Sequence, residues 1–132
     1  GQALKDYRAL LKQGLIRPGQ LELYIMNLQD RQPLQLTDNG AANFWPFWHP
    51  AGKHNIFSSN LHDPGGRNFD LYLINIDTRA LERITHFEDF DGFPMFSHDG
   101  RQLVFASNRF GKVKGETNIF IANFSINGFS RD

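Results

Sequence analysis

The chain of 132 residues contains no cysteine, so a disulfide framework and a thiolate metal site are both excluded. It has no excess of either charge, because 14 basic residues balance 14 acidic ones. That balance argues against nucleic acid as a partner and against a polybasic contact with a membrane surface. No apolar run approaches the roughly 20 residues that cross a bilayer as a helix, so we expect no membrane insertion.

The residues that the chain does have in number are phenylalanine, with 13, and glycine, with 12. Segment 93–109 shows how they are used, because its apolar residues alternate on both sides of Asp99-Gly100. The alternation predicts two strands, and glycine after aspartate predicts a tight turn, since glycine adopts positive φ without a Cβ clash. The same hairpin occurs 48 residues earlier, in segment 43–60, where Gly52 takes the place of Gly100.

A further strand is repeated three times at the same spacing. It reads LYIMNL at 23–28, LYLINI at 71–76 and IFIANF at 119–124. A period of 48 residues built from short strands is typical of propeller blades or of a solenoid. No helical pattern lies inside the period, which excludes the helical repeats. Strands are predicted at 21–28, 34–37, 43–48, 55–59, 69–76, 81–85, 93–96, 103–107 and 118–124.

Residues 2–13 are the helical candidate, because their apolar residues recur at spacings of three and four on one face. These residues are Leu4, Tyr7 and Leu11. Gly14 is the expected end of the helix, and Pro18-Gly19 the expected turn into the first strand. We expect a short cap on a sheet edge, with a partner-binding helix as the alternative.

The hairpin at 94–109 matches the motif P-x-F-S-x-D-G-x-x-L-x-F-x-S-N-R. In this the chain resembles the WD40-like β-propeller repeat family of the TolB type, also called the PD40 type. The downstream part of the family repeat is matched at Asp70, Leu71, Tyr72, Asn75, Ile84 and Thr85. The first copy departs from the motif at His49, Pro50 and Ala51. The resemblance covers about residues 21–124.

The resemblance implies an all-β fold, a partial β-propeller of four-stranded antiparallel blades. After the N-terminal helix and turn (1–19), we expect a partial blade at 20–42, a full blade at 43–90 and a partial blade at 91–132. Apolar blade faces must stack on neighbours, so we expect self-association through the open faces. A piece of a longer propeller and a smaller capped structure are the alternatives.

The resemblance also implies a non-enzymatic segment that binds a protein or peptide partner in the cell envelope of a Gram-negative bacterium. The expected location is the periplasm, with a leader removed ahead of Gly1. The alternative is the propeller part of an enzyme, a peptidase or a sugar-acid lyase, whose catalytic residues lie outside this chain. Carbohydrate binding through Trp45 and Trp48 is a third interpretation.

Chemical motifs in the sequence do not support catalysis. Ser97-His98-Asp99 lies within the predicted turn, where neighbouring side chains point in different directions and cannot form a triad. The five histidines lack the spacing of helical zinc ligands, and we expect those in the turns to face solvent. The glycine loop at 63–67 lacks the Lys-Ser/Thr ending and the helix of a phosphate loop. We therefore expect no cofactor and no metal.

Two features favour partner contact. Three acids lie in the connection before the predicted strand at 93–96, and two tryptophans lie in the predicted strand at 43–48. Carboxylates attract a basic peptide or a hard cation, and tryptophan is enriched at binding hot spots. A solvated acidic loop and plain core packing are the alternatives. The predicted contact residues are Asn43, Trp45, Trp48, Glu88, Asp89 and Asp91.

Overall fold

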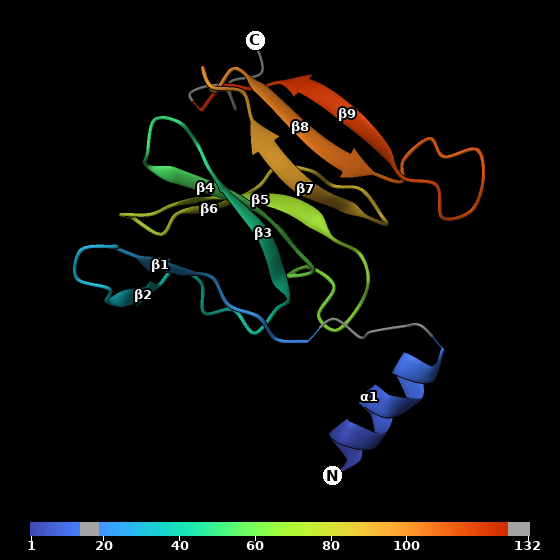
Figure 1. Ribbon diagram of the computed structural model, residues 1–132. Coiled ribbons are helices and arrows are strands. Elements are labelled where there is room, and N and C mark those ends of the chain that lie inside the picture. The colour runs from blue at the N-terminus through green and yellow to red at the C-terminus, as the bar shows by residue number, and fades with distance from the viewer. Residues whose placement is uncertain (14–18, 127–132) are drawn as a thin grey trace.

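The computed structural model describes residues 1–13 and 19–126. Within them the chain forms one helix and three antiparallel sheets (Figure 1). The helix is α1 (Gln2–Lys12). The N-terminal sheet contains β1 (Tyr24–Met26) and β2 (Pro33–Gln35). The middle sheet contains β3 (Asn43–Trp48), β4 (His54–Ser59), β5 (Asp70–Asn75) and β6 (Leu81–Arg83). The C-terminal sheet contains β7 (Asp91–Phe96), β8 (Gln102–Ser107) and β9 (Asn118–Asn123).

Every predicted strand is present, and its ends differ from the prediction by at most three residues. The architecture, mostly antiparallel β with one helix, confirms the predicted fold class at that level. Each strand pairs with the next strand in the chain, so each sheet is a meander. The two hairpin glycines, Gly52 and Gly100, have φ of 81° and 71°, as their turns require.

Residues 48 positions apart occupy matching places in different sheets. Leu71 is the second residue of β5, and Ile119 is the second residue of β9. Leu23 directly precedes β1, and its carbonyl accepts a hydrogen bond from the Leu36 N–H at 2.7 Å. The Leu71 carbonyl accepts the same bond from the Ile84 N–H, also at 2.7 Å.

The middle sheet is buried on both faces, which explains why β5 is almost continuously apolar in sequence. One cluster joins it to the C-terminal sheet and contains Ile56, Leu71, Leu73, Phe96, Leu103 and Phe105. The other joins it to the N-terminal sheet and contains Leu23, Leu36, Phe57, Tyr72 and Ile74. Successive sheets therefore stack face to face in chain order.

Helix α1 extends away from the sheets (Figure 1) and buries none of its residues. Its apolar face is open, with Leu4 51%, Tyr7 48% and Leu11 44% exposed. The helix does not cap a sheet edge in this structure, so that expectation is wrong. The predicted helix end at Gly14 and turn at Pro18 lie outside the described residues. Within residues 1–13 and 19–126, no helix has the length and apolar character needed to span a membrane.

Candidate functional site

The six predicted contact residues separate into buried and exposed groups. Asn43 is fully buried at the start of β3. Its amide nitrogen donates to the Leu21 carbonyl at 2.8 Å and to Asn39 Oδ1 at 2.9 Å. Its Oδ1 accepts a hydrogen bond from the Ser59 hydroxyl at 2.8 Å. Asn43 thus fixes the start of the strand from inside and offers no exposed surface to a partner.

Asp91 occupies the matching place at the start of β7 and is also fully buried. Its Oδ2 accepts a hydrogen bond from Arg109 Nη2 at 2.7 Å. The Arg109 guanidinium also lies over the rings of Phe87, Phe105 and Phe120, at 5.1 to 5.9 Å from their centroids. Asp91 is therefore neutralised by an internal cation, which separates it from the exposed acids Glu88 and Asp89.

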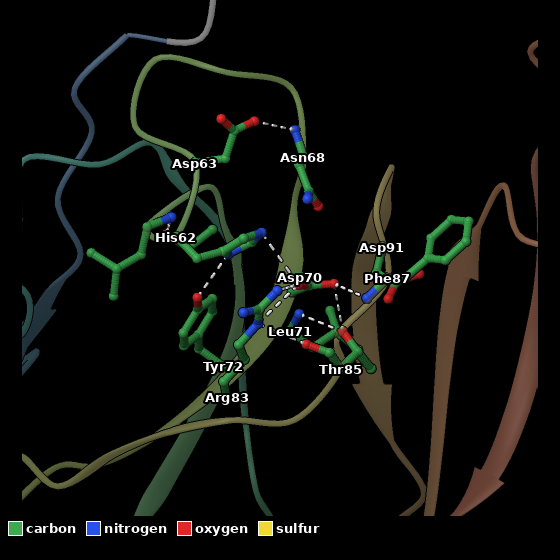
Figure 2. Close-up of polar contacts among 12 residues, drawn as sticks. His62, Asp63, Asn68, Asp70, Leu71, Tyr72, Arg83, Thr85, Phe87 and Asp91 are labelled. Carbon is green, nitrogen blue, oxygen red and sulfur yellow. Dashed lines mark hydrogen bonds and ion pairs between the residues drawn. The ribbon is translucent and has the colours of Figure 1, made fainter.

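A second buried carboxylate, Asp70 of β5, lies at the centre of the polar contacts in Figure 2. Its Oδ1 accepts hydrogen bonds from the Phe87 N–H at 2.9 Å and from the Thr85 hydroxyl at 3.3 Å. Its Oδ2 accepts two hydrogen bonds from the Arg83 guanidinium. His62 Nε2 lies 3.4 Å from the same oxygen. The network closes the connection after β6.

Glu22 makes the same contacts one sheet earlier. It accepts hydrogen bonds from the Thr37 hydroxyl at 2.6 Å and from the N–H groups of Asn39 at 3.1 Å and Gly40 at 2.8 Å. Burial raises the pKa of Glu22, but these hydrogen bonds outweigh it, and the pKa lies below its ordinary value. Sequence reasoning missed both acids, although Glu22 and Asp70 stand 48 residues apart.

The exposed part of the site is aromatic. Trp45 and Phe93 lie at β-bulges, where the pairing of β3 with β4 and of β7 with β8 shifts register. They have φ of 53° and 51°, a conformation that is unusual for bulky side chains. A bulge redirects a side chain, and here it brings the two rings together with centroids 4.0 Å apart.

Phe90 completes this aromatic surface, which we define as Trp45, Phe90 and Phe93. The Phe90 ring lies 5.9 Å from that of Trp45 and 6.2 Å from that of Phe93. Phe93 is 51% exposed, and Trp45 and Phe90 are half-buried. The exposed acids Glu88 and Asp89 directly precede Phe90 in the chain. The surface therefore combines solvent-accessible rings with negative charge, which suits apolar and basic side chains of a partner.

Trp48 lies away from this surface, at the other end of β3. It is 43% exposed and borders a pocket with Tyr24, Ile25 and Met26. The N-terminal sheet has only two described strands, so little covers this end of β3. The predicted pair of tryptophans is thus divided between two places.

His49 corrects the expectation that turn histidines face solvent, because it is only 8% exposed. Its Nδ1 accepts a hydrogen bond from the Ala51 N–H at 3.1 Å. Its ring packs edge-on against Phe96 of the next sheet, with centroids 4.9 Å apart. Glycine at 100 makes room for it, since a Cβ there would lie 2.5 Å from His49 Nε2. Burial lowers the pKa of His49.

The described residues contain no group of three or more His, Asp or Glu side chains arranged to hold a metal ion. The polar contacts of Figure 2 instead hold loops against strands. Tyr72 accepts or donates one of them, at 2.9 Å to His62 Nδ1, and its burial raises the pKa of its hydroxyl. The geometry therefore favours binding at the aromatic surface.

No model of a known protein family matches the sequence. Individual relatives do match. The chain is 31% identical over 98 residues to the Tol-Pal system protein TolB of Francisella tularensis subsp. mediasiatica. It is 33% identical over 95 residues to a TolB homologue of Chlorobium luteolum. The chain belongs to the TolB-like β-propeller family.

Solved TolB structures share the fold. A TolB crystal structure from Acinetobacter baumannii matches with a TM-score of 0.62 and 23% identity, over 83% of this chain and 25% of that one. A protein of Agrobacterium tumefaciens, provisionally assigned as TolB, matches with a TM-score of 0.55 and 31% identity, over 69% and 30%. The chain spans about a fifth of the curated TolB relatives, 21% of the Francisella protein and 20% of the Chlorobium protein.

Proposed function

We propose that the chain is a non-enzymatic part of a TolB-like β-propeller that binds a protein partner in the periplasm. The relatives named as TolB proteins of the Tol-Pal system support this, because the match covers 74% of the chain. The partner is then a protein component of such a system. The observation that carries the binding role is the exposed aromatic surface of Trp45, Phe90 and Phe93 beside two exposed acids.

In this proposal the three sheets are consecutive blades: a partial blade at 20–42, a full blade at 43–90 and a partial blade at 91–132. The face-to-face packing of the middle sheet against both neighbours supports it. Complete propellers typically have four to eight blades. The first strands, β3 and β7, are then the inner strands of their blades, and the aromatic surface lies at the channel side.

The binding role is tested by calorimetric titration of the purified chain with the purified Pal protein of a Tol-Pal system. We expect saturable binding that weakens about 30-fold or more in the Trp45→Ala/Phe93→Ala variant, because truncating a buried aromatic anchor typically costs about 2 kcal/mol. Trp48→Ala is the matched control and should bind as the unmodified chain does. Absence of binding by a folded chain would overturn the proposed partner, and equal binding by all three would overturn the proposed surface.

Open blade faces are the second part of the proposal, and they predict self-association. Ile119 and Ile121 of β9 are each 70% exposed, and Met95 of β7 is 51% exposed on the same sheet. Sedimentation should show a dimer or larger species, and Ile121→Glu should shift the mass towards the monomer. A monomer at all concentrations, with or without the substitution, would contradict this part alone.

A further inference from the structure

Two of the three sheets bind a short segment, an apolar residue followed by threonine, in the same way. In the N-terminal sheet, the N–H groups of Leu36 and Thr37 donate to the Leu23 carbonyl at 2.7 and 3.3 Å. The Thr37 hydroxyl accepts a hydrogen bond from the Leu23 N–H at 2.8 Å and donates to Glu22 at 2.6 Å. One threonine thus satisfies both the backbone and the acid before it.

Ile84 and Thr85 repeat this arrangement on the middle sheet. Their N–H groups donate to the Leu71 carbonyl at 2.7 and 3.4 Å. The Thr85 hydroxyl accepts a hydrogen bond from the Leu71 N–H at 2.9 Å and donates to Asp70 at 3.3 Å. The Ile84 side chain packs against the buried cluster between the sheets. The same four bonds therefore define one kind of seat, formed by a polar residue and the apolar residue after it.

The third copy of this seat is Asn118-Ile119 in β9, and the described residues leave it empty. β9 pairs only with β8 in the part of the chain that the structure describes. Ile119 opposes Ala106 as Leu71 opposes Ser58. In that register the backbone N–H and C=O of Ile119 face the open edge of the sheet. Its side chain is 70% exposed, whereas that of Leu71 is fully buried.

We propose that the open edge of β9 binds an extended segment of the protein partner, in which an apolar residue is followed by threonine. The segment adds to the sheet as a fourth strand, a common mode of peptide recognition. Its threonine hydroxyl accepts a hydrogen bond from the Ile119 N–H and donates to Asn118 Oδ1. Its apolar residue covers the exposed side chain of Ile119. The inference rests on the proposed protein-binding function.

The seat on β9 differs in charge from the other two, and this difference specifies the partner. Asp70 pairs with Arg83, which lies two residues before Thr85. Asn118 is neutral, so the partner needs no arginine two residues before its threonine. A polar uncharged residue suits that place, as Gln35 does before Thr37 in the N-terminal sheet. An unpaired arginine there would lose its ion pair.

The test uses a fluorescent peptide with the sequence RALQITHFE, which carries the middle sheet's own segment with glutamine in place of Glu82-Arg83. Fluorescence anisotropy with the full chain should show saturable binding. The peptide with valine in place of threonine should bind about tenfold more weakly, because valine keeps the shape and removes the hydroxyl bonds. Ile119→Pro should abolish binding, since proline removes the backbone donor and is tolerated at an edge.

Asn118→Asp is a gain-of-function control that does not depend on loss of folding. It restores the acid found at positions 22 and 70, so it should bind the arginine-containing peptide RALERITHFE about tenfold more tightly than the unmodified chain does. Equal affinity for the threonine and valine peptides, or unchanged binding by Ile119→Pro, would overturn the proposal. A dimer abolished by Ile119→Pro would instead identify a second copy as the occupant and would also overturn it. Pal binding that persists in Ile119→Pro separates this failure from failure of the proposed function.

Discussion

The middle and C-terminal sheets place similar residues at the same positions and bury them to different extents. Leu71 and Leu73 of β5 are 0% and 3% exposed, while Ile119 and Ile121 of β9, 48 residues later, are each 70% exposed. The difference comes from the neighbour, because the C-terminal sheet covers the first pair and no described element covers the second. An apolar pattern in a repeat therefore states what a face needs, and the next sheet determines whether it is met.

The polar positions of the two sheets differ in a second way. Asn43 opens β3 and satisfies its amide and carbonyl within the chain. Asp91 opens β7, and its Oδ1 is buried without a partner among the described residues. Asp91 is held through its other oxygen by Arg109. The amide is complete without charge, whereas the carboxylate depends on one cation, and this makes the C-terminal sheet the more vulnerable of the two.

The largest expected effect compares the apolar positions directly. Leu71→Ala should lower the free energy of unfolding by about 3 kcal/mol, because it leaves a cavity between two packed sheets. Ile119→Ala should change it by less than about 0.5 kcal/mol, because the side chain is mostly in water. Urea unfolding followed by circular dichroism measures both. Equal losses would show that the face of β9 is covered in solution, and would break the comparison.

The next effect concerns the buried charge. Arg109→Ala should lower the free energy of unfolding by about 2–3 kcal/mol, because it leaves the Asp91 carboxylate buried and unpaired. Water that reaches the partly exposed arginine keeps the loss below that of a fully buried pair. Urea unfolding again provides the measurement.

Asp91→Asn supplies the control, because it copies the amide of Asn43 at the matching position. In the Arg109→Ala background it should recover most of the loss, leaving the contribution of the guanidinium to ring packing. If the double variant is as unstable as Arg109→Ala alone, then the loss comes from those rings and the carboxylate is not the cause.

The strands could be predicted because alternation and turn glycines are local signals, and each sheet is a meander of neighbours in the chain. Ends were less certain, as at β1, which is shorter than the apolar segment 21–28. The position of α1 could not be predicted, because an amphipathic face shows that a helix needs a partner but does not say whether the chain provides one.

The site was predicted less well, for a reason that lies in the repeat itself. Asn43 and Asp91 look like exposed loop residues in sequence, yet each starts a strand beside the preceding sheet and is buried by it. Phe93 was missed although it stands 48 residues after Trp45, because φ above zero at both positions is invisible in the alternation. The offset that identified the apolar repeat also relates Glu22 to Asp70, and applying it to polar residues would have found the network.

The smallest expected effect is a pH dependence that separates the first hairpin from the second. Burial lowers the pKa of His49 in the folded state, while an unfolded histidine titrates near about 6.5. As the pH falls through 6.5, the unfolded chain takes up the proton first, so the free energy of unfolding should fall until the pH reaches the folded-state pKa. His49→Gln should flatten this slope between about pH 7.5 and 5.5, whereas His98→Gln, at an exposed position of the second hairpin, should leave it unchanged. Urea unfolding across this pH range measures the slope, and a slope that persists in His49→Gln would assign it to another histidine.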